Sequence, residues 1–346
     1  MTFLMSFYPY PKSILFEVTY RCNLRCIHCY EPKYNGEEMS TDEVLCLIDQ
    51  AAELGVPHIS FGGGEPLVRK DIFTLLKYAS DSNIAVELLS NGTLIDEDTA
   101  KRLVACGVRA VSVSLDSATP EVHNAIRRKD CFETVIHAIE CLIDAGLRVE
   151  INTTFTKLNL RDFEGVVRLS KKLGASMVRA VRLVSLGRAE ENDVLISPTS
   201  EDYHWFSDML YEVSKKYSDK NFAVTGDDAF APFLYIKNKK QRMTWLPGNY
   251  MGCIGGRVIV SIDPHGNVYP CCYLKYPEFC GGNVTEESLK DIWEREDSFK
   301  ELRNLTLPTG KCRGCEYLEF CRGGCRGAAY IKTKSLTAPD PYCWIQ

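Results

Sequence analysis

ILFEVTYRCNLRCIHC, residues 14–29, joins a short apolar run to three closely spaced cysteines. Its first part, ILFEVTY (14–20), is rich in β-branched and aromatic residues and predicts a strand. Cys22, Cys26 and Cys29 follow at once, separated by three and two residues. This spacing lets one loop wrap three thiolates around a face of an iron–sulfur cube. One iron of the cube is then left open to another ligand.

Beyond this loop, strand-like and helix-like stretches alternate until about residue 185. We predict further strands at 58–61, 85–90, 110–115, 148–155 and 177–184, and helices at 40–55, 71–82, 96–107, 132–146 and 160–174. Such repeats predict a parallel sheet with right-handed crossovers. Six units fall short of a complete eight-unit barrel. The expected fold class is therefore α/β: a partial (β/α)6 TIM-like barrel with a small cysteine-rich C-terminal iron–sulfur domain.

Three parts are expected along the chain. Residues 1–190 form the barrel core, whose active groups should sit at the carboxyl ends of the strands. Residues 191–250 form a bridge with one helix at 199–217 and a loop that contains prolines. Residues 251–346 are rich in Gly, Pro and Cys and leave little room for a core. We expect this last part to depend on metal for its fold.

The composition narrows the class of protein. A net charge of -5, from 41 basic and 46 acidic residues, lacks the basic excess that nucleic-acid binding needs. No long uncharged apolar run predicts a transmembrane helix. The first residues, MTFLMSFYPYPKS, lack the basic and apolar regions of a signal peptide. We therefore expect a cytoplasmic protein that binds neither nucleic acid nor membrane.

Sixteen cysteines are many for a cytoplasmic chain of 346 residues, and they indicate metal binding rather than disulfides. Twelve of them fall within 22–29 and 253–343. The other four are expected to be ordinary buried thiols: Cys46, Cys106, Cys131 and Cys141. For the first group, the alternatives to an open cluster are a zinc site that includes His28 and a ferredoxin-type cluster that needs a fourth local cysteine.

A second motif, FGGGEP at 61–66, follows the second predicted strand. Its glycines expose backbone amides and carbonyls to a ligand, and the Glu65 carboxylate can accept a hydrogen bond from an ammonium group. The motif has neither the Gly-x-Gly-x-x-Gly form of a dinucleotide fingerprint nor a Walker lysine. Alone it is a weak signal, but together with the cysteine loop it is a strong one.

CNLRCIHC followed by GGGEP resembles the radical SAM superfamily, whose signature is Cys-x3-Cys-x2-Cys, over about residues 13–190. The resemblance implies that the open iron binds the amino and carboxylate groups of S-adenosylmethionine (SAM). It also implies that reduction of the cluster cleaves SAM to a 5′-deoxyadenosyl radical, which takes hydrogen from a substrate. One departure is His28, which stands where the family often has a flat aromatic. Its ring packs near adenine, or it is an ordinary core or surface histidine.

The resemblance assigns the SAM contacts residue by residue. It implies that the second motif contacts the methionine amine and that polar residues after the next strands contact ribose or methionine. The implied residues are Gly62, Gly63, Gly64, Glu65 and Pro66 in the first group, and Ser90, Asn91, Ser114, Asp116 and Arg127 in the second.

The C-terminal cysteines are similar in order and spacing to the SPASM extension of radical SAM enzymes, which normally carries two auxiliary 4Fe–4S clusters. The resemblance implies a closed cluster on Cys312, Cys315, Cys321 and Cys343, and a second cluster on Cys253, Cys271 and Cys325. Three clusters are then expected in all. The second auxiliary cluster either keeps an open iron, which we favour, or is closed by Cys272 or Cys280. A pair of zinc knuckles is the alternative.

The segment KCRGCEYLEFCRGGCRGAAYIKTKSLTAPDPYCWI, residues 311–345, resembles one subgroup of the family. That subgroup includes the haem d1 protein NirJ, enzymes of the siroheme-dependent haem pathway and the mycofactocin maturase. We therefore expect oxidative decarboxylation or side-chain removal on a tetrapyrrole, with flavodoxin or ferredoxin as reductant. Arg179, Arg182 and Arg188 are candidates to bind substrate carboxylates, although solvated arginines are an equally good interpretation.

Two alternatives remain open. One is a maturase that crosslinks or decarboxylates a precursor peptide. Only about a dozen residues precede the first strand, which leaves no room there for the peptide-recognition domain that many such enzymes carry. The other is an electron-transfer or cluster-carrier protein that does not turn over SAM.

Overall fold

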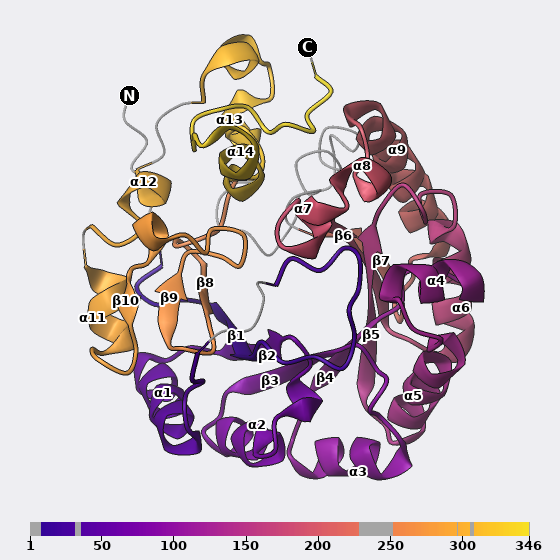
Figure 1. The fold of residues 1–346 in the computed structure, drawn as a ribbon, viewed down its shortest axis with the longest axis vertical. Helices are drawn as coiled ribbons and strands as arrows, with labels where there is room; N and C mark the ends of the chain where they lie inside the picture. The colour runs from indigo at the N-terminus through magenta and orange to yellow at the C-terminus, as the bar shows by residue number, and fades with distance from the viewer. Residues whose placement is uncertain (1–7, 32–35, 228–251, 296, 305–307, 346) are drawn as a thin grey trace.

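The computed structural model describes residues 8–31, 36–227, 252–295, 297–304 and 308–345. Their strands form one curved sheet, with helices on its outer face (Figure 1). All six predicted strands are present and pair in parallel, in chain order. They are β1 (Ser13–Thr19), β2 (His58–Gly63), β3 (Ala85–Ser90), β4 (Ala110–Ser114), β5 (Arg148–Phe155) and β6 (Met177–Arg182). The predicted partial barrel is confirmed for these six strands.

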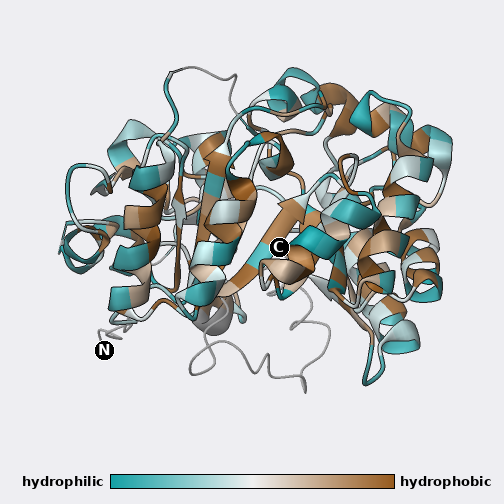
Figure 2. Cartoon of the chain, turned by 90° about the horizontal axis from the view of Figure 1, so that it is seen from below, coloured by the Kyte–Doolittle hydropathy of each residue, from teal (hydrophilic) through white to brown (hydrophobic). Residues whose placement is uncertain are grey.

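The five predicted helices of the core are also present. They are α1 (Thr41–Leu54), α2 (Ile72–Asp81), α3 (Glu97–Ala105), α5 (Phe132–Asp144) and α6 (Phe163–Leu173). Ser40 and Glu43 form a capping box at the start of α1, and Gly55 ends that helix in the left-handed conformation. Figure 2 shows hydrophobic and hydrophilic turns along the helices, beside strands that are largely hydrophobic. Amphipathic helices of this kind bury their apolar faces against the sheet.

One helix of the core was not predicted. α4 (Pro120–Arg127) lies between β4 and α5, in a stretch for which the sequence pattern predicts no helix or strand. Proline at its first position is the local signal for it, because the fixed φ of proline suits a helix start. The helix matters for the site, since it returns the chain from the end of β4 to the cavity described below.

The predicted bridge contains more regular structure than one helix. α7 (Arg188–Glu191), α8 (Asp193–Ile196) and α9 (Ser200–Tyr217) lead to a seventh strand, β7 (Ala223–Gly226). β7 pairs in parallel with β6, so the strand–helix order continues past residue 186, where it was predicted to stop. A four-residue strand is too short to be recognised from its sequence pattern. Residues 228–250 of the bridge lie outside the described residues.

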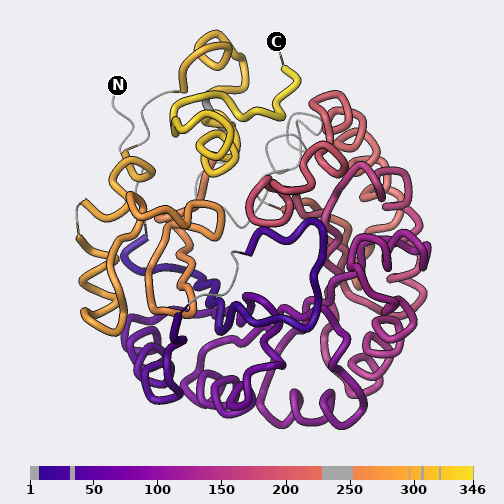
Figure 3. The backbone as a smooth tube through the Cα atoms, in the orientation of Figure 1, coloured from indigo at the N-terminus to yellow at the C-terminus, as the bar shows by residue number. Residues whose placement is uncertain are grey.

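The C-terminal segment joins the same sheet. β8 (Ile259–Ile262) pairs in parallel with β1, so the described strands include eight parallel ones. β9 (Asn267–Tyr269) and β10 (Gly282–Asn283) continue the sheet antiparallel. Figure 3 shows this orange part of the chain beside the indigo first strand. The segment ends with α11 (Leu289–Glu294), α12 (Lys300–Arg303), α13 (Leu318–Cys321) and α14 (Arg326–Thr333).

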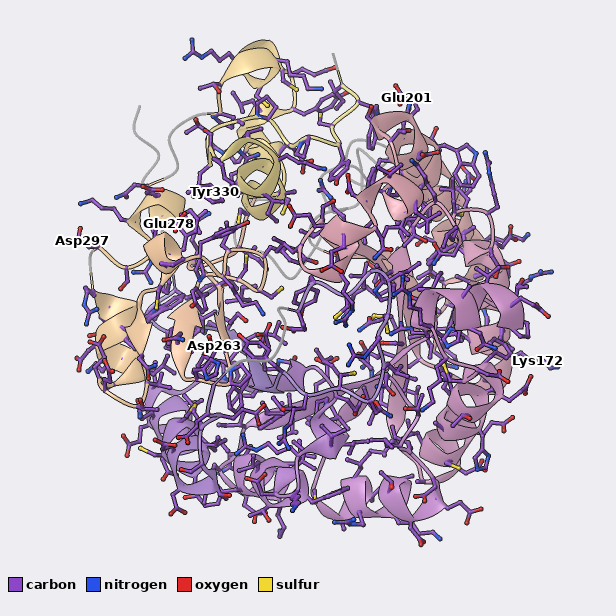
Figure 4. The ribbon with its side chains drawn as sticks, viewed as in Figure 1. Lys172, Glu201, Asp263, Glu278, Asp297 and Tyr330 are labelled. Atoms are coloured by element: carbon purple, nitrogen blue, oxygen red, sulfur yellow. The ribbon has the colours of Figure 1, made fainter. Side chains whose placement is uncertain are left out.

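The expectation that this segment has little core of its own is corrected in part. Val260, Ile262, Ile292 and Trp293 are buried in one hydrophobic cluster with the barrel residues. The expectation that the segment depends on metal for its fold stays a prediction. Tyr330 of α14 donates a hydrogen bond to Glu278, which ties the last helix to the segment after β9 (Figure 4).

Two smaller expectations can be compared with the structure. Cys106, Cys131 and Cys141 are buried, as predicted for ordinary thiols, but Cys46 is exposed on α1. Cys46 therefore lies on the solvent face of its helix. Across the described residues, each helix is too short or too polar to span a membrane.

Candidate active site

A cavity of about 600 Å³ lies at the carboxyl ends of the parallel strands. The loop after β1, the start of the second motif, and the ends of β3 to β6 all contribute to its wall. The C-terminal segment adds Cys272 and Tyr273. Strand carboxyl ends are where barrel enzymes place their active groups. The cavity is large enough for a small-molecule cofactor together with part of a substrate.

The three N-terminal cysteines lie together on this wall. Cys22 is exposed, Cys29 is partly buried and Cys26 is buried. The Cys22 sulfur accepts from the Leu24 amide at 3.4 Å, and the Cys26 sulfur from Arg127 Nη1 at 3.7 Å. Burial raises the pKa of the Cys29 thiol to about 11. The raised pKa means that burial disfavours the thiolate form of Cys29. A coordinating iron displaces the thiol proton and stabilises the thiolate, which offsets this cost.

Gly63 and Gly64 line the cavity, and both need to be glycine for steric reasons. A Cβ on Gly63 would lie 2.4 Å from the Thr19 carbonyl oxygen, and one on Gly64 2.3 Å from that of Arg21. The Gly64 amide donates to Thr19 O and the Glu65 amide to Arg21 O. Both amides already donate hydrogen bonds within the protein, so they are not free to donate to a ligand. A ligand amine at this edge would have to donate to acceptor groups of the protein. This suits an ammonium group, which is only a donor.

Glu65 lies beneath the cavity floor rather than on its wall. It is fully buried, and its carboxylate accepts from Ser90 Oγ at 3.0 Å, the Asn91 amide at 2.8 Å and the Leu67 amide at 3.2 Å. The last bond caps the short 3-10 helix η1 (Pro66–Val68). Burial raises the pKa of Glu65 to about 7. In this arrangement Glu65 holds the cavity-lining Ser90 and Asn91 in place.

Of the other implied SAM contacts, Ser90, Asn91, Ser114 and Arg127 line the cavity, whereas Gly62, Pro66 and Asp116 do not. Asp116 does not line the cavity itself but contacts two residues that do. Its Oδ2 lies 3.0 Å from His28 Nε2 and 2.8 Å from Arg127 Nε. Although burial alone would raise the pKa of Asp116, the charges of Arg127 and His28 hold it well below its usual range. Asp116 therefore orients two side chains that line the cavity.

Several lining residues were not singled out from the sequence, and two of them are polar residues of one strand. Asn152 and Thr154 lie on β5, two positions apart, so both side chains face the barrel interior. Asn152 Oδ1 is a buried acceptor without a hydrogen-bond partner among the described residues. An unpartnered buried acceptor on a cavity wall fits a donor on a ligand. Alternating polar residues in an otherwise apolar strand are the signal that could have found them.

A buried charged group adjoins the cavity from the C-terminal side. Lys275 Nζ lies 2.7 Å from Glu17 Oε2 and 2.9 Å from Glu31 Oε2. Burial and the neighbouring Glu31 raise the pKa of Glu17 to about 8. Lys275 thus connects the first strand and the cysteine loop to the C-terminal segment. No sequence signal singled out these three residues.

The four cysteines implied for the closed cluster surround a second, small cavity. Cys312, Cys315, Cys321 and Cys343 all line it, with Gly323, Gly324 and Asp340. They come from 3-10 helix η3 (Gly310–Gly314), its C-cap, α13 and the chain end. The structure brings the whole set together. That it binds a cluster stays a prediction.

The other implied auxiliary set is also brought together. Burial raises the pKa of Cys271 well above its usual value, and the nearby thiols of Cys272, Cys253 and Cys325 raise it further, in that order. Of the two residues considered as a fourth ligand, Cys272 lines the large cavity instead. Cys280 is exposed, and its thiol donates to the Gly282 carbonyl at 3.5 Å. The open iron at that set, with closure by Cys272 or Cys280 as the alternative, stays a prediction.

The spacing of the cysteines bears on the zinc alternatives. In the part of the chain that the structure describes, no three His, Cys, Asp or Glu side chains are grouped closely enough to hold one metal ion. A four-iron cube places a separate iron beside each thiolate and so keeps the sulfurs farther apart than one tetrahedral zinc ion does. The choice between clusters and zinc therefore rests on the comparisons with known proteins.

Comparison with known proteins agrees with this geometry. Residues 16–170 match the Radical SAM superfamily, and residues 253–316 match the SPASM iron–sulfur cluster-binding domain. The chain is 34% identical to the AdoMet-dependent heme synthase of Methanosarcina barkeri, with 96% of each chain covered. It is 32% identical to the mycofactocin maturase MftC of Mycolicibacterium smegmatis, with 96% of this chain and 82% of that protein covered.

The fold is similar to that of SuiB from Streptococcus suis in its crystal structure with bound S-adenosylmethionine. The TM-score is 0.80, with 97% of this chain and 78% of that chain covered. At 20% identity this likeness concerns the fold alone. Together, the sequence matches establish an enzyme that uses SAM and 4Fe–4S clusters. The carrier alternative is thereby set aside, and the chain belongs to the radical SAM superfamily as a member with a SPASM domain.

Proposed function

We propose that this enzyme oxidatively decarboxylates, or removes, carboxylate side chains of a tetrapyrrole. The observation that carries the proposal is the charge of the cavity wall. Five arginines line it, and among the described lining residues Glu31 is the sole acidic one. A tetrapyrrole with several propionates is a polyanion, which a wall of this charge suits. The similarity to a haem synthase points to the same class of substrate.

Three of the five arginines already have acidic partners. Arg21 pairs with Glu38, Arg127 with Asp116 and Arg182 with Asp340. The charges of these three arginines are therefore balanced by acidic residues of the protein. Arg25 and Arg188 form no ion pair with the described residues. Arg188 Nε donates to the Cys26 carbonyl at 3.0 Å, which holds the guanidinium beside the cysteine loop.

Of the arginines considered from the sequence, Arg188 is therefore the best candidate to bind a substrate carboxylate. Arg179 is paired with Glu150 at 3.1 Å, and both Nη atoms of Arg182 bond Asp340. Arg25 is exposed and joins Arg188 as a second candidate. A guanidinium can bind a carboxylate through two parallel hydrogen bonds, which fixes the orientation of the side chain.

The chemistry divides between the cofactors and the chain. When bound, the reduced cluster and SAM supply a 5′-deoxyadenosyl radical. Decarboxylation of a propionate removes one hydrogen atom, breaks the bond to the carboxylate, releases CO2 and leaves one electron. In this scheme Arg188 and Arg25 hold the carboxylate, while the cavity wall limits the access of water to the reacting carbon. The electron must then leave the cavity. Both auxiliary cysteine sets belong to the C-terminal segment, which contributes Cys272 and Tyr273 to the cavity wall.

We infer three 4Fe–4S clusters held by ten cysteines. Cys22, Cys26 and Cys29 would hold the SAM-binding cluster. The auxiliary clusters would be held by Cys253, Cys271 and Cys325, with one iron open, and by Cys312, Cys315, Cys321 and Cys343. The division into a core at 1–190, a bridge at 191–250 and a SPASM domain at 251–346 stays part of the proposal. The two family matches fall within its first and last parts.

We also infer the cellular setting. Radical generation consumes an electron, which a flavodoxin or ferredoxin would supply. All sixteen cysteines are free thiols rather than disulfides. Free thiols in this number suit a reducing compartment and support a cytoplasmic location.

The test is anaerobic reconstitution with SAM, dithionite and an iron coproporphyrin, which carries four propionates. We expect equal amounts of 5′-deoxyadenosine, CO2 and vinyl side chain. Arg188→Gln and Arg25→Gln should each raise the KM for the porphyrin about tenfold, because a charge-assisted hydrogen bond is lost. Arg168→Gln, at an exposed position on α6, is the control. Cleavage of SAM with no change in the porphyrin would overturn the proposal.

A peptide maturase is the second candidate, because the similarity to MftC is nearly as high as that to the haem synthase. The same assay separates the two when a precursor peptide encoded near the gene replaces the porphyrin. A peptide that loses CO2 or gains a crosslink, while the porphyrin is unchanged, would establish the maturase instead. Arg188→Gln should then affect the acceptance of a peptide carboxylate.

A further inference from the structure

A buried ion pair joins the barrel to the cysteine-rich segment. Arg182, the last residue of β6, bonds Asp340 in bidentate fashion: Nη1 lies 2.7 Å from Oδ2, and Nη2 donates to Oδ1. The two residues are 158 positions apart in the chain. Both side chains are almost completely inaccessible to solvent.

The pair spans the wall between the two cavities. Arg182 lines the large cavity, where the substrate is proposed to react, and Asp340 lines the small cavity of the four cysteines. The rings of Tyr203 and Tyr342 lie on the guanidinium, with centroids at 5.4 and 4.6 Å. The aromatic contacts and the bidentate geometry fix the position of both charges.

Asp340 contacts both auxiliary cysteine sets. Its Oδ2 accepts from the Cys325 amide at 2.9 Å, and its backbone carbonyl accepts from the Cys343 amide at 3.1 Å. Cys325 belongs to the three-cysteine set and Cys343 to the four-cysteine set. A single carboxylate is thus placed between the two sites.

Stability alone does not account for this pair. Replacing a buried ion pair by apolar residues is often neutral or stabilising, because both charges lose their hydration on burial. A fixed charge beside an iron–sulfur cluster, in contrast, changes the reduction potential of that cluster. The place of the pair, between the substrate cavity and the auxiliary sites, favours this second role.

We propose that Arg182 and Asp340 are positioning residues whose balanced charges set the reduction potentials of the auxiliary clusters that receive the substrate electron. The inference rests on the proposed function, since it requires clusters on both C-terminal sets. The Asp340 charge disfavours reduction of the neighbouring clusters, and the Arg182 charge offsets it. Removing one member therefore leaves the other uncompensated, and the direction of the shift depends on which one is removed.

The experiment is an anaerobic redox titration followed by electron paramagnetic resonance, with iron counted per chain. It uses the full chain in which Cys22, Cys26 and Cys29 are replaced by Ala, so that the auxiliary clusters alone give the signal. Arg182→Gln should shift the potentials down and Asp340→Asn should shift them up. The double variant should return toward the parent value. Arg179→Gln is the matched control, because Arg179 lies on the same strand and pairs with Glu150 instead.

The outcomes separate the two levels of the proposal. Opposite shifts at full iron content support the inference. Full iron content with no shift, or with shifts in the same direction, overturns it and leaves the proposed function intact. If the single variants lose iron, the double variant and Arg182→Lys are decisive, and loss of iron in these as well shows a purely structural pair. A parent chain without auxiliary iron overturns the proposed function, and the inference with it.

Discussion

The N-terminal cysteine loop and the four-cysteine group near the C-terminus gather sulfurs in similar numbers, but their surroundings differ. Cys22, Cys26 and Cys29 border a cavity of about 600 Å³ with a polar, arginine-rich wall. Cys312, Cys315, Cys321 and Cys343 enclose one of about 20 Å³. We refer to them as the open site and the closed site.

The site with fewer cysteines has the larger free volume beside them. Three thiolates leave one corner of a cube without a protein ligand, and the open site has room there for a cofactor and part of a substrate. Four thiolates complete the cube, and the closed site, at about 20 Å³, has no room for an added cofactor or substrate. The first arrangement suits chemistry on an added molecule, and the second suits electron storage or transfer.

The largest effect is expected at the open site. Cys26→Ala should abolish 5′-deoxyadenosine formation, because the cluster that binds SAM is lost. Iron should fall from about twelve to about eight atoms per chain, as one of three four-iron clusters disappears. Chemical iron analysis and chromatography of the nucleoside measure both quantities.

Cys46→Ala is the control for this change, since Cys46 is an exposed cysteine on α1, away from either cavity. It should leave iron and SAM cleavage at the parent level. If Cys26→Ala instead removed all iron, the open and closed sites would not be independent, and the division between them would fail.

At the closed site, Cys321→Ala should give the converse result. About four irons should be lost, while cleavage of SAM without substrate continues, because the open site is intact. Product formation should drop by at least about tenfold, since the substrate electron has lost its outlet. The ratio of 5′-deoxyadenosine to product measures this uncoupling. An unchanged ratio in a chain that has lost four irons would show that the closed site takes no part in turnover.

A smaller effect is expected at Gly63, which brings the ends of β1 and β2 together. Gly63 has a φ of 109°, and a Cβ there would lie 2.4 Å from Thr19 O. Gly63→Ala should lower the free energy of unfolding by about 1–2 kcal/mol for the left-handed backbone and by about 1–3 kcal/mol more for the clash. It should also weaken SAM binding, since the cavity edge must move.

Gly55→Ala provides the matched control. Gly55 is also left-handed, with a φ of 80°, but a Cβ there meets nothing within 4 Å. Only the backbone cost of about 1–2 kcal/mol should appear, and SAM affinity should not change. Urea unfolding and equilibrium dialysis with SAM distinguish the two variants. Equal losses of stability and affinity in both would contradict the steric account of Gly63.

Local pattern was enough to predict much of the fold and the open site. The six strands, the Ser40 cap and the position of the cysteines after the first strand all depend on residues close in sequence. Contacts between distant residues could not be predicted in this way. β8 pairs with β1 across more than half of the chain, and Arg182 meets Asp340 across 158 positions. No local preference encodes such pairs.

The site shows the same limit. Glu65 and Asp116 were assigned to the cofactor by resemblance, yet both lie behind the wall and orient other residues. Their role depends on burial and on partners from other elements. Arg127 reaches Asp116 because α4 turns the chain back, and that helix has only a proline start as its local signal.

The smallest effect concerns the support of the open site and its pH dependence. His123 Nδ1 accepts from the Asp116 amide at 3.2 Å, and its ring also faces Arg127, His28 and Cys131. Burial, with the charge of Arg127, lowers the pKa of His123 to about 4. As pH falls below about 6.5, the unfolded chain gains a proton that the folded chain does not. Stability should therefore fall between pH 6.5 and 4, by about 1–3 kcal/mol in all.

His123→Asn keeps an acceptor near the Asp116 amide but does not titrate, so the slope of stability against pH should become shallower between pH 7 and 5. The control is His204→Asn, at an exposed position on α9, which should keep the parent slope. SAM affinity in the parent should also fall once His123 itself gains a proton near pH 4, because its ring then no longer accepts from the amide of Asp116, which orients His28 and Arg127 at the open site. The closed site has the Arg182–Asp340 pair beside it, and the described residues of its wall include no histidine, so its iron content should stay constant over the same range. Loss of closed-site iron before loss of SAM affinity would reverse the expected order and show that the two sites share one acid-sensitive support.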